Sequence, residues 1–256
     1  MPKFSACIEW LFAEDGDTFA SRIHRAHEAG LGLIEFWRWT DKDIDAIEAA
    51  LDQTGVGVSS LVAEPMIALT DPANRGLWLK GLEASLKVAQ RLGAPVLIAQ
   101  AGDDLPDFSR AVQRKALTEA LQAGADILRG SGVSLGVEPL NTRIDHAGYF
   151  LDSTVEGLDI IDDVARPEIR IVYDIYHSAV MDERTEDVLK GRVDRVIHVH
   201  VADHPGRNEP SSGRIDLAHR LNWLVANGYQ GSVGLEYRPL KPGGAAVKAA
   251  IAALAL

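Results

Sequence analysis

A short apolar segment followed by a helical segment recurs eight times along the chain, and this alternation limits the possible folds more than any other feature. We expect strands at 4–8, 31–36, 56–62, 95–99, 133–138, 169–174, 196–201 and 232–236, and helices at 18–29, 41–54, 72–92, 109–129, 154–164, 185–190, 217–227 and 245–254. Such alternation is typical of βαβ units and a parallel sheet. The 256 residues in eight units average 32 each, the repeat size of a (β/α)8 barrel. We therefore predict one α/β domain over residues 1–256, a TIM barrel.

An open, doubly wound sheet is the main alternative. That fold favours a glycine-rich nucleotide fingerprint after the first strand, and the segment after residue 8 has none. Closure also explains why the fifth and eighth strands are alike, since residues 134–138 and 232–236 both have the pattern Ser-x-Gly-x-Glu. Alternate strand residues share a face, so Ser, Gly and Glu would point into the barrel and the aliphatic residues toward the helices.

The composition is that of an ordinary globular protein, with 46% hydrophobic and 25% charged residues. The formal net charge of −11 argues against a surface that binds nucleic acid. The single cysteine, Cys7, excludes an internal disulfide framework and suits a reducing compartment. Glu9 interrupts the N-terminal apolar run, and no stretch of about 18 uncharged apolar residues follows. We expect a cytoplasmic protein with a small-molecule substrate and no membrane or nucleic-acid partner; a homo-oligomer is left open.

Three carboxylates and one imidazole fall at or near the carboxyl ends of four consecutive predicted strands, where TIM barrels carry their chemistry. They are Glu138, Asp174, His200 and Glu236, separated by 36, 26 and 36 residues. A single such residue is usually solvated or structural, but four in phase with the repeat favour a common site. Bunched carboxylates repel one another unless protons or a cation lie between them. Three oxygen donors and one nitrogen suit Mn2+, Mg2+ or Co2+ best and also admit Zn2+.

The segments around these residues resemble the signature segments of hydroxypyruvate isomerase-like proteins, a branch of the xylose isomerase-like (sugar phosphate isomerase/epimerase) superfamily of TIM barrels. The resemblance is close from residue 133 to 239 and loose at the N-terminus. Two departures concern the substrate: the branch often has Gln in place of His200, where ketose epimerases have His, and Asn-Leu-Ser in place of residues 7–9. The matching segments are Glu-Pro-Leu-Asn at 138–141, Asp-Ile-Tyr-His at 174–177, His-Val-His-Val-Ala-Asp at 198–203, Pro-Gly-Arg-Asn-Glu-Pro at 205–210 and Gly-Tyr-Gln-Gly-Ser-Val-Gly-Leu-Glu-Tyr-Arg-Pro at 228–239.

The resemblance implies a divalent-metal-dependent aldose–ketose isomerase that acts on a small hydroxy-keto acid or sugar through an enediolate. It makes metal ligands of Glu138, Asp174, His200 and Glu236. It also makes Glu138 and Glu236 the acid/base pair. It also implies that His177 and Arg207 contact the substrate. Without the resemblance, Arg207 would be interpreted as a solvated loop residue, and the alternative for His177 is a hydrogen bond to a ligand carboxylate.

Other functions remain open on the same scaffold. A ketose 3-epimerase would return the proton to the same carbon, and an inosose dehydratase-like lyase would lose water. A non-catalytic sugar-binding barrel would keep the metal without turnover. Glu35, beside an aromatic cluster, is either a polar anchor in a pocket wall or a salt-bridged structural residue. Glu64 and Gln100, at the rims of the third and fourth strands, could reach a substrate or be solvated.

Overall fold

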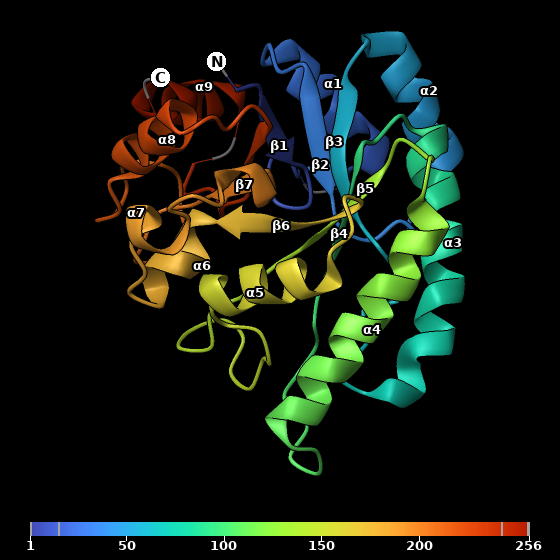
Figure 1. The fold of residues 1–256 in the computed structure, drawn as a ribbon. Coiled ribbons are helices and arrows are strands. Elements are labelled where there is room, and N and C mark those ends of the chain that lie inside the picture. Colours follow the sequence, from blue (N-terminus) through green and yellow to red (C-terminus); the bar gives the residue numbers. More distant parts are fainter. Residues whose placement is uncertain (1, 15, 242, 255–256) are drawn as a thin grey trace.

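The computed structural model describes residues 2–14, 16–241 and 243–254. Within these residues, eight parallel strands close into a barrel in which each strand pairs with its sequence neighbours and β1 pairs with β8 (Figure 1). The predicted TIM barrel is therefore confirmed, and the open-sheet alternative is excluded. The strands are β1 (Phe4–Cys7), β2 (Leu33–Phe36), β3 (Gly57–Val62), β4 (Val96–Ala99), β5 (Ser134–Val137), β6 (Ile169–Asp174), β7 (Val196–Val201) and β8 (Ser232–Leu235).

The helices lie outside the barrel, and α8 and α9 lie near the N-terminus in Figure 1. Side chains at N-cap positions fix several helix starts: Asp43, Ser109 and Ser153 each accept a hydrogen bond from a backbone N–H three residues later. The α-helices are α1 (Phe19–Glu28), α2 (Ile44–Thr54), α3 (Arg75–Arg91), α4 (Arg110–Leu128), α5 (Thr154–Val164), α6 (Ile175–Val180), α7 (Thr185–Val188), α8 (Leu217–Ala226) and α9 (Gly244–Ala253), and the 3-10 helices are η1 (Pro72–Asn74) and η2 (Val193–Arg195).

The sixth unit differs from the sequence prediction. A short helix, α6, follows β6 directly, and the predicted helix at 185–190 is a single turn, α7. Asp174 explains the early start, because its carboxylate accepts hydrogen bonds from the backbone N–H groups of Tyr176 and His177. This helix matters for the site, since it carries His177.

The buried side chains on the two faces of the sheet differ in character. The aliphatic residues of the repeated pattern, Leu135, Val137, Val233 and Leu235, belong to the large apolar core cluster, as expected for side chains that pack against the helices. A smaller cluster of Val62, Val96, Ile98 and Val172 lies apart from it. The other alternate residues of several strands are buried but polar, and they prepare the site at the carboxyl ends: Ser5, Glu35, Ser60, His198 and His200.

Two strand glycines make room for other side chains in the barrel interior. A Cβ at Gly136 would lie 2.6 Å from Cγ2 of Val172, and a Cβ at Gly234 would lie 2.2 Å from Oε1 of Glu35. The prediction that small residues leave space below each carboxylate is confirmed. Among the described helices, none combines the length and apolar character that crossing a membrane requires.

Candidate active site

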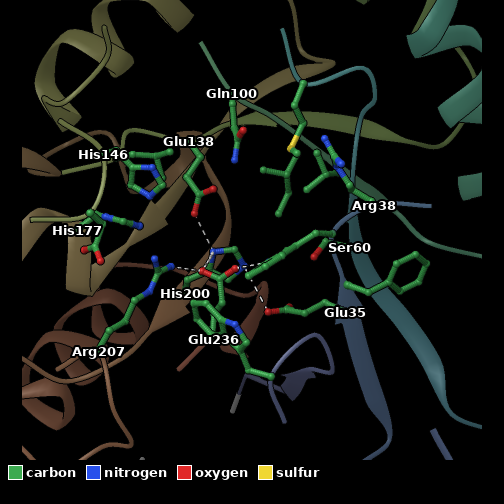
Figure 2. A pocket seen from close by; sticks show the side chains of 18 of the residues that line it. Glu35, Arg38, Ser60, Gln100, Glu138, His146, His177, His200, Arg207 and Glu236 are labelled. Carbon is green, nitrogen blue, oxygen red and sulfur yellow. Dashed lines mark hydrogen bonds and ion pairs between the residues drawn. The ribbon is translucent and has the colours of Figure 1, made fainter. Parts of the chain in front are cut away.

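The four residues singled out by their spacing converge at the carboxyl end of the barrel. Glu138 and Glu236 each directly follow a strand, β5 and β8, while Asp174 ends β6 and His200 lies on β7. Each residue is at most 6% exposed, and one ligand atom from each lies within 4.8 Å of the others. Figure 2 shows Glu138 and Glu236 approaching His200 from different sides.

His200 lies at the centre of the group. Its Nδ1 is 2.8 Å from Oε1 of Glu138 and 3.7 Å from Oε2 of Glu236. Its Nε2 faces the barrel interior, 3.3 Å from Oε1 of Glu35. Nδ1 therefore faces the carboxylates of Glu138 and Glu236, whereas Nε2 faces that of Glu35.

Neighbouring donors fix the orientation of Glu236. The indole Nε1 of Trp37 donates to its Oε1 at 2.7 Å, and the guanidinium of Arg207 donates to its Oε2 at 2.5 Å. Arg207 also lies 3.6 Å from Oδ2 of Asp174. Both oxygens of Glu236 are thus held, whereas Glu138 contacts the ring of His200 through Oε1.

The environments of the carboxylates move their pKa values apart. Burial raises the pKa of Glu138 above its usual value, and the charges of Glu236 and Asp174 act in the same direction against the opposing effect of His200. Burial likewise raises the pKa of Asp174. Burial opposes the charged form of Glu236 too, but His200 and Arg207 outweigh it and lower its pKa. Glu236 is therefore the more acidic member of the glutamate pair.

The donor set fits a divalent cation. Three buried carboxylates lie within 4.8 Å of one imidazole, and burial raises the pKa values of two of them, so their charged forms need compensation beyond that from His200 and Arg207. A divalent cation would supply that compensation, and carboxylate oxygens with one imidazole nitrogen are suitable ligands. The four residues could therefore hold a metal ion.

His177 lies on α6 with one ring nitrogen satisfied and the other free. Its Nδ1 accepts a hydrogen bond from the backbone N–H of Asn141 at 3.1 Å. The proton is consequently on Nε2, which is buried and has no hydrogen-bond partner among the described residues. Burial and the charge of Arg207 lower the pKa of His177 well below its usual value, so the ring is neutral. An unsatisfied buried donor therefore lies beside Asp174, 3.5 Å from its Oδ2.

Arg207 is held in the loop after β7 and is only 7% exposed, in contrast to a solvated loop arginine. Its backbone has a positive φ of 54°, and its guanidinium lies over the rings of Trp10 and Tyr176 at 5.1 and 5.2 Å from their centroids. The guanidinium Nε is buried without a hydrogen-bond partner in the described part of the chain. One donor therefore stays available beside the carboxylates.

A cavity of about 380 Å3 opens above these residues. His177, His146 and Arg207 lie on one side of it in Figure 2, and Arg38 and Ser60 lie on the other. Sequence reasoning missed several of its lining residues, because loop side chains carry no periodic signal. The missed lining residues include Trp10, Arg38, Met66, Asp145, His146 and Arg238.

Three further candidates from the sequence are resolved by their contacts. Glu35 lines the cavity and so forms part of a pocket wall, and its Oε2 also contacts interior side chains, Ser5 and His198. Glu64 is buried and accepts from the backbone N–H groups of Trp39 and Thr40, so it is neither solvated nor part of the cavity lining. Gln100 does line the cavity.

Fold and site together define a class of protein. The profile of the xylose isomerase-like TIM barrels matches residues 23–255, and the chain belongs to that family. Hydroxypyruvate isomerase of Escherichia coli is 29% identical over 246 residues, covering 93% of this chain and 94% of the relative. The 2-oxo-tetronate isomerase of Cupriavidus necator is 29% identical over 248 residues, with the same coverage. A crystal structure of a family 2 AP endonuclease from Brucella melitensis has a TM-score of 0.89 at 27% identity, covering 96% of this chain and 97% of that one.

The predicted resemblance to hydroxypyruvate isomerases is thereby confirmed, and the relatives place the chain among isomerases of this family. The match extends over nearly the whole length of those relatives, although the sequence motifs that predicted it were confined to residues 133–239.

Proposed function

We propose that the protein is a divalent-metal-dependent isomerase that interconverts the ketose and aldose forms of a small hydroxy-keto acid. The observation that carries this proposal is the convergence of Glu138, Asp174, His200 and Glu236 within 4.8 Å, beside a cavity that Glu138, His200 and Glu236 line. In this proposal the four residues bind the metal, with Mn2+, Mg2+ or Co2+ preferred. When bound, the ion supplies a Lewis acid that acidifies the C–H bond of an α-hydroxycarbonyl and stabilises the negative charge of the enediolate.

The two glutamates transfer the proton. Glu236 has the lowered pKa and is ionised at neutral pH, so it is suited to accept the proton from the hydroxyl-bearing carbon. Glu138 has the raised pKa and holds a proton more readily, so it is suited to deliver one to the neighbouring carbon. Delivery to that neighbouring carbon gives isomerisation, whereas return to the first carbon from the other face gives epimerisation.

His177 and Arg207 bind and orient the substrate in this proposal. The free Nε2–H of His177 would donate to a substrate oxygen, which satisfies a donor that is otherwise buried without a partner. The guanidinium of Arg207 would attract a substrate carboxylate while it holds Glu236 in place. Trp10 and Trp37, packed edge to face at 4.9 Å, help to exclude water from this side of the cavity.

The substrate class follows from the cavity and from the names of the relatives. Two relatives are named for a hydroxypyruvate and a 2-oxo-tetronate reaction, so a 2-oxo acid of three or four carbons is the proposed substrate. The cavity of about 380 Å3 corresponds to roughly a dozen water volumes of ~30 Å3 each, which accommodates either acid.

Incubation with Mn2+ and hydroxypyruvate or 2-oxo-tetronate in D2O tests the proposal. We expect the aldehyde isomer, with deuterium at the carbon that receives the proton, detected by NMR and mass spectrometry. Ketoses serve as the comparison substrates, because C3 epimerisation would identify an epimerase instead, and loss of water from an inosose would identify a lyase. Ligand-dependent thermal shifts without any turnover across this panel would indicate a non-catalytic binding barrel.

A further inference from the structure

A buried carboxylate outside the proposed ligand set touches the only imidazole within that set. Glu35 lies on β2 and is 3% exposed, and it reaches across the barrel interior toward β7. Its Oε2 accepts hydrogen bonds from Ser5 at 2.6 Å and Ser59 at 3.1 Å, and it is 2.9 Å from Nε2 of His198. Three neighbours therefore fix the position of this carboxylate.

The other oxygen of Glu35 is directed at His200. Oε1 is buried, has no hydrogen bond within the described residues, and lies 3.3 Å from Nε2 of His200. Nδ1 of the same ring faces Glu138 and Glu236 at 2.8 and 3.7 Å. The carboxylate of Glu35 and the proposed metal ligands thus lie at opposite nitrogens of one imidazole.

The surrounding residues maintain this contact. The ring of His198 stands edge-on to that of His200, with 4.8 Å between their centroids, and its Nδ1 is 2.9 Å from the hydroxyl of Ser232. A Cβ at position 234 would lie 2.2 and 2.6 Å from the two oxygens of Glu35 and 2.6 Å from Cδ2 of His200. Only glycine at position 234 lets Glu35 and His200 meet.

We propose that Glu35 is a positioning residue that accepts the Nε2–H of His200 and thereby directs the Nδ1 lone pair to the divalent cation of the active site. An imidazole can bind a metal through either nitrogen, and a carboxylate at one nitrogen selects the other as the ligand and fixes the ring orientation. This inference rests on the proposed metal role of His200.

The same geometry argues against a second metal ion between Glu35, His198 and His200, although these residues also lie within 4.8 Å of one another. Oε2 of Glu35 already has two hydroxyl donors and one imidazole nitrogen around it. In the proposed arrangement the Nε2–H of His200 donates to Oε1, so both oxygens of Glu35 already face a proton donor. We therefore expect one metal ion per chain.

Metal affinity tests the role of Glu35 independently of turnover. Binding of Mn2+ is measured by calorimetry for the wild type, Glu35→Gln and Ser5→Ala. We expect Glu35→Gln to weaken Mn2+ binding about 10- to 100-fold, the usual effect of removing a carboxylate behind a metal-binding histidine. Ser5→Ala is the matched control, since it removes a hydrogen bond to Oε2 of the same carboxylate but leaves Oε1 facing His200. We expect its affinity to change less than about threefold.

A second measurement uses the wild type and does not depend on a variant that folds. In the Zn2+-loaded protein, the 15N spectrum of the imidazoles should show His200 protonated at Nε2 and coordinated through Nδ1. Coordination through Nε2, equal Mn2+ affinity in Glu35→Gln and wild type, or a second equivalent of bound Mn2+ would each overturn the role of Glu35. If His200→Asn binds Mn2+ as tightly as the wild type, His200 is not a ligand and the proposed metal centre fails with it.

Discussion

Glu138 and Glu236 occupy equivalent places in two strand repeats, yet their surroundings make them chemically different. Arg207 and Trp37 hold both oxygens of Glu236, while Glu138 contacts the imidazole of His200. The difference in pKa that results is what a reaction needs when one carboxyl group removes a proton and another returns it.

Conservative substitution of either glutamate should abolish most turnover. In Glu138→Gln and Glu236→Gln the shape is kept but the base is lost, so we expect kcat to fall about 10^2- to 10^4-fold with Mn2+ present. Glu64→Gln is the control, because Glu64 is a buried glutamate that accepts backbone hydrogen bonds outside the cavity. Near-normal turnover in both Glu138→Gln and Glu236→Gln would remove these residues from the mechanism.

His177 should stay neutral under conditions that charge an ordinary histidine. Burial, together with the positive charge of Arg207, lowers its pKa well below the usual ~6.5. A lowered pKa favours the neutral ring at any pH above it, so the Nε2–H tautomer should persist from about pH 8 to about pH 6. NMR titration of the imidazole nitrogens measures this directly. A protonation midpoint at or above the usual ~6.5 would contradict the assignment of His177 as a neutral donor.

At the scale of elements, the close approach of α3 to the loop after β3 constrains one glycine. A Cβ at Gly81 would lie 2.2 Å from the carbonyl oxygen of Glu64 and 2.3 Å from Cδ of Pro65. We expect Gly81→Ala to lower the free energy of unfolding by about 1–3 kcal/mol, as overpacking does. Gly76→Ala on the same helix meets nothing within 4 Å and should raise the free energy of unfolding by about 0.5–1 kcal/mol. Urea denaturation measures both, and equal midpoints for the two variants would contradict the tight contact.

The elements were largely predictable from local patterns, and the exceptions have local causes. Helix α6 was missed because it is only six residues long, yet Asp174 three residues before His177 is an N-cap signal that could have indicated it. Glu35 was assigned to the end of its strand. β2 ends one residue later, at Phe36, and its pairing with β3 shifts between Ile34 and Glu35; such an irregularity leaves no trace in the pattern of apolar residues.

Over the whole molecule, the eightfold repeat made the fold and the convergence of four site residues predictable, because strand ends in a closed barrel meet at one rim. The walls of the cavity were not predictable in the same way. His146 and Trp37 reach the cavity from loops, and their direction depends on contacts such as the hydrogen bond from Trp37 to Glu236. Periodicity places the strands, but it does not specify the path that each long loop takes over the barrel.

Metal binding should control the stability of the whole domain, since the proposed ligands come from four strands that together form half of the barrel. Mn2+ at 100 times its Kd should stabilise the fold by about 2.7 kcal/mol. For a domain of this size that corresponds to a rise in Tm of about 5–10 °C. Calorimetry with Mn2+ and with EDTA measures the shift.

The variant Glu138→Gln should affect the stability of the metal-free protein and of the Mn2+-bound protein in opposite directions. In EDTA the substitution removes one of three buried, mutually repelling carboxylates. The pKa of Glu138 is raised above its value in an unfolded chain, so its charged form destabilises the folded state at neutral pH. The metal-free variant should therefore be at least as stable as the wild type. With Mn2+ it lacks a ligand, so the rise in Tm should largely disappear, while Glu64→Gln keeps the full rise. If Glu138→Gln kept the wild-type shift, Glu138 would not bind the ion, and the repulsion between carboxylates would have to be relieved by protons instead.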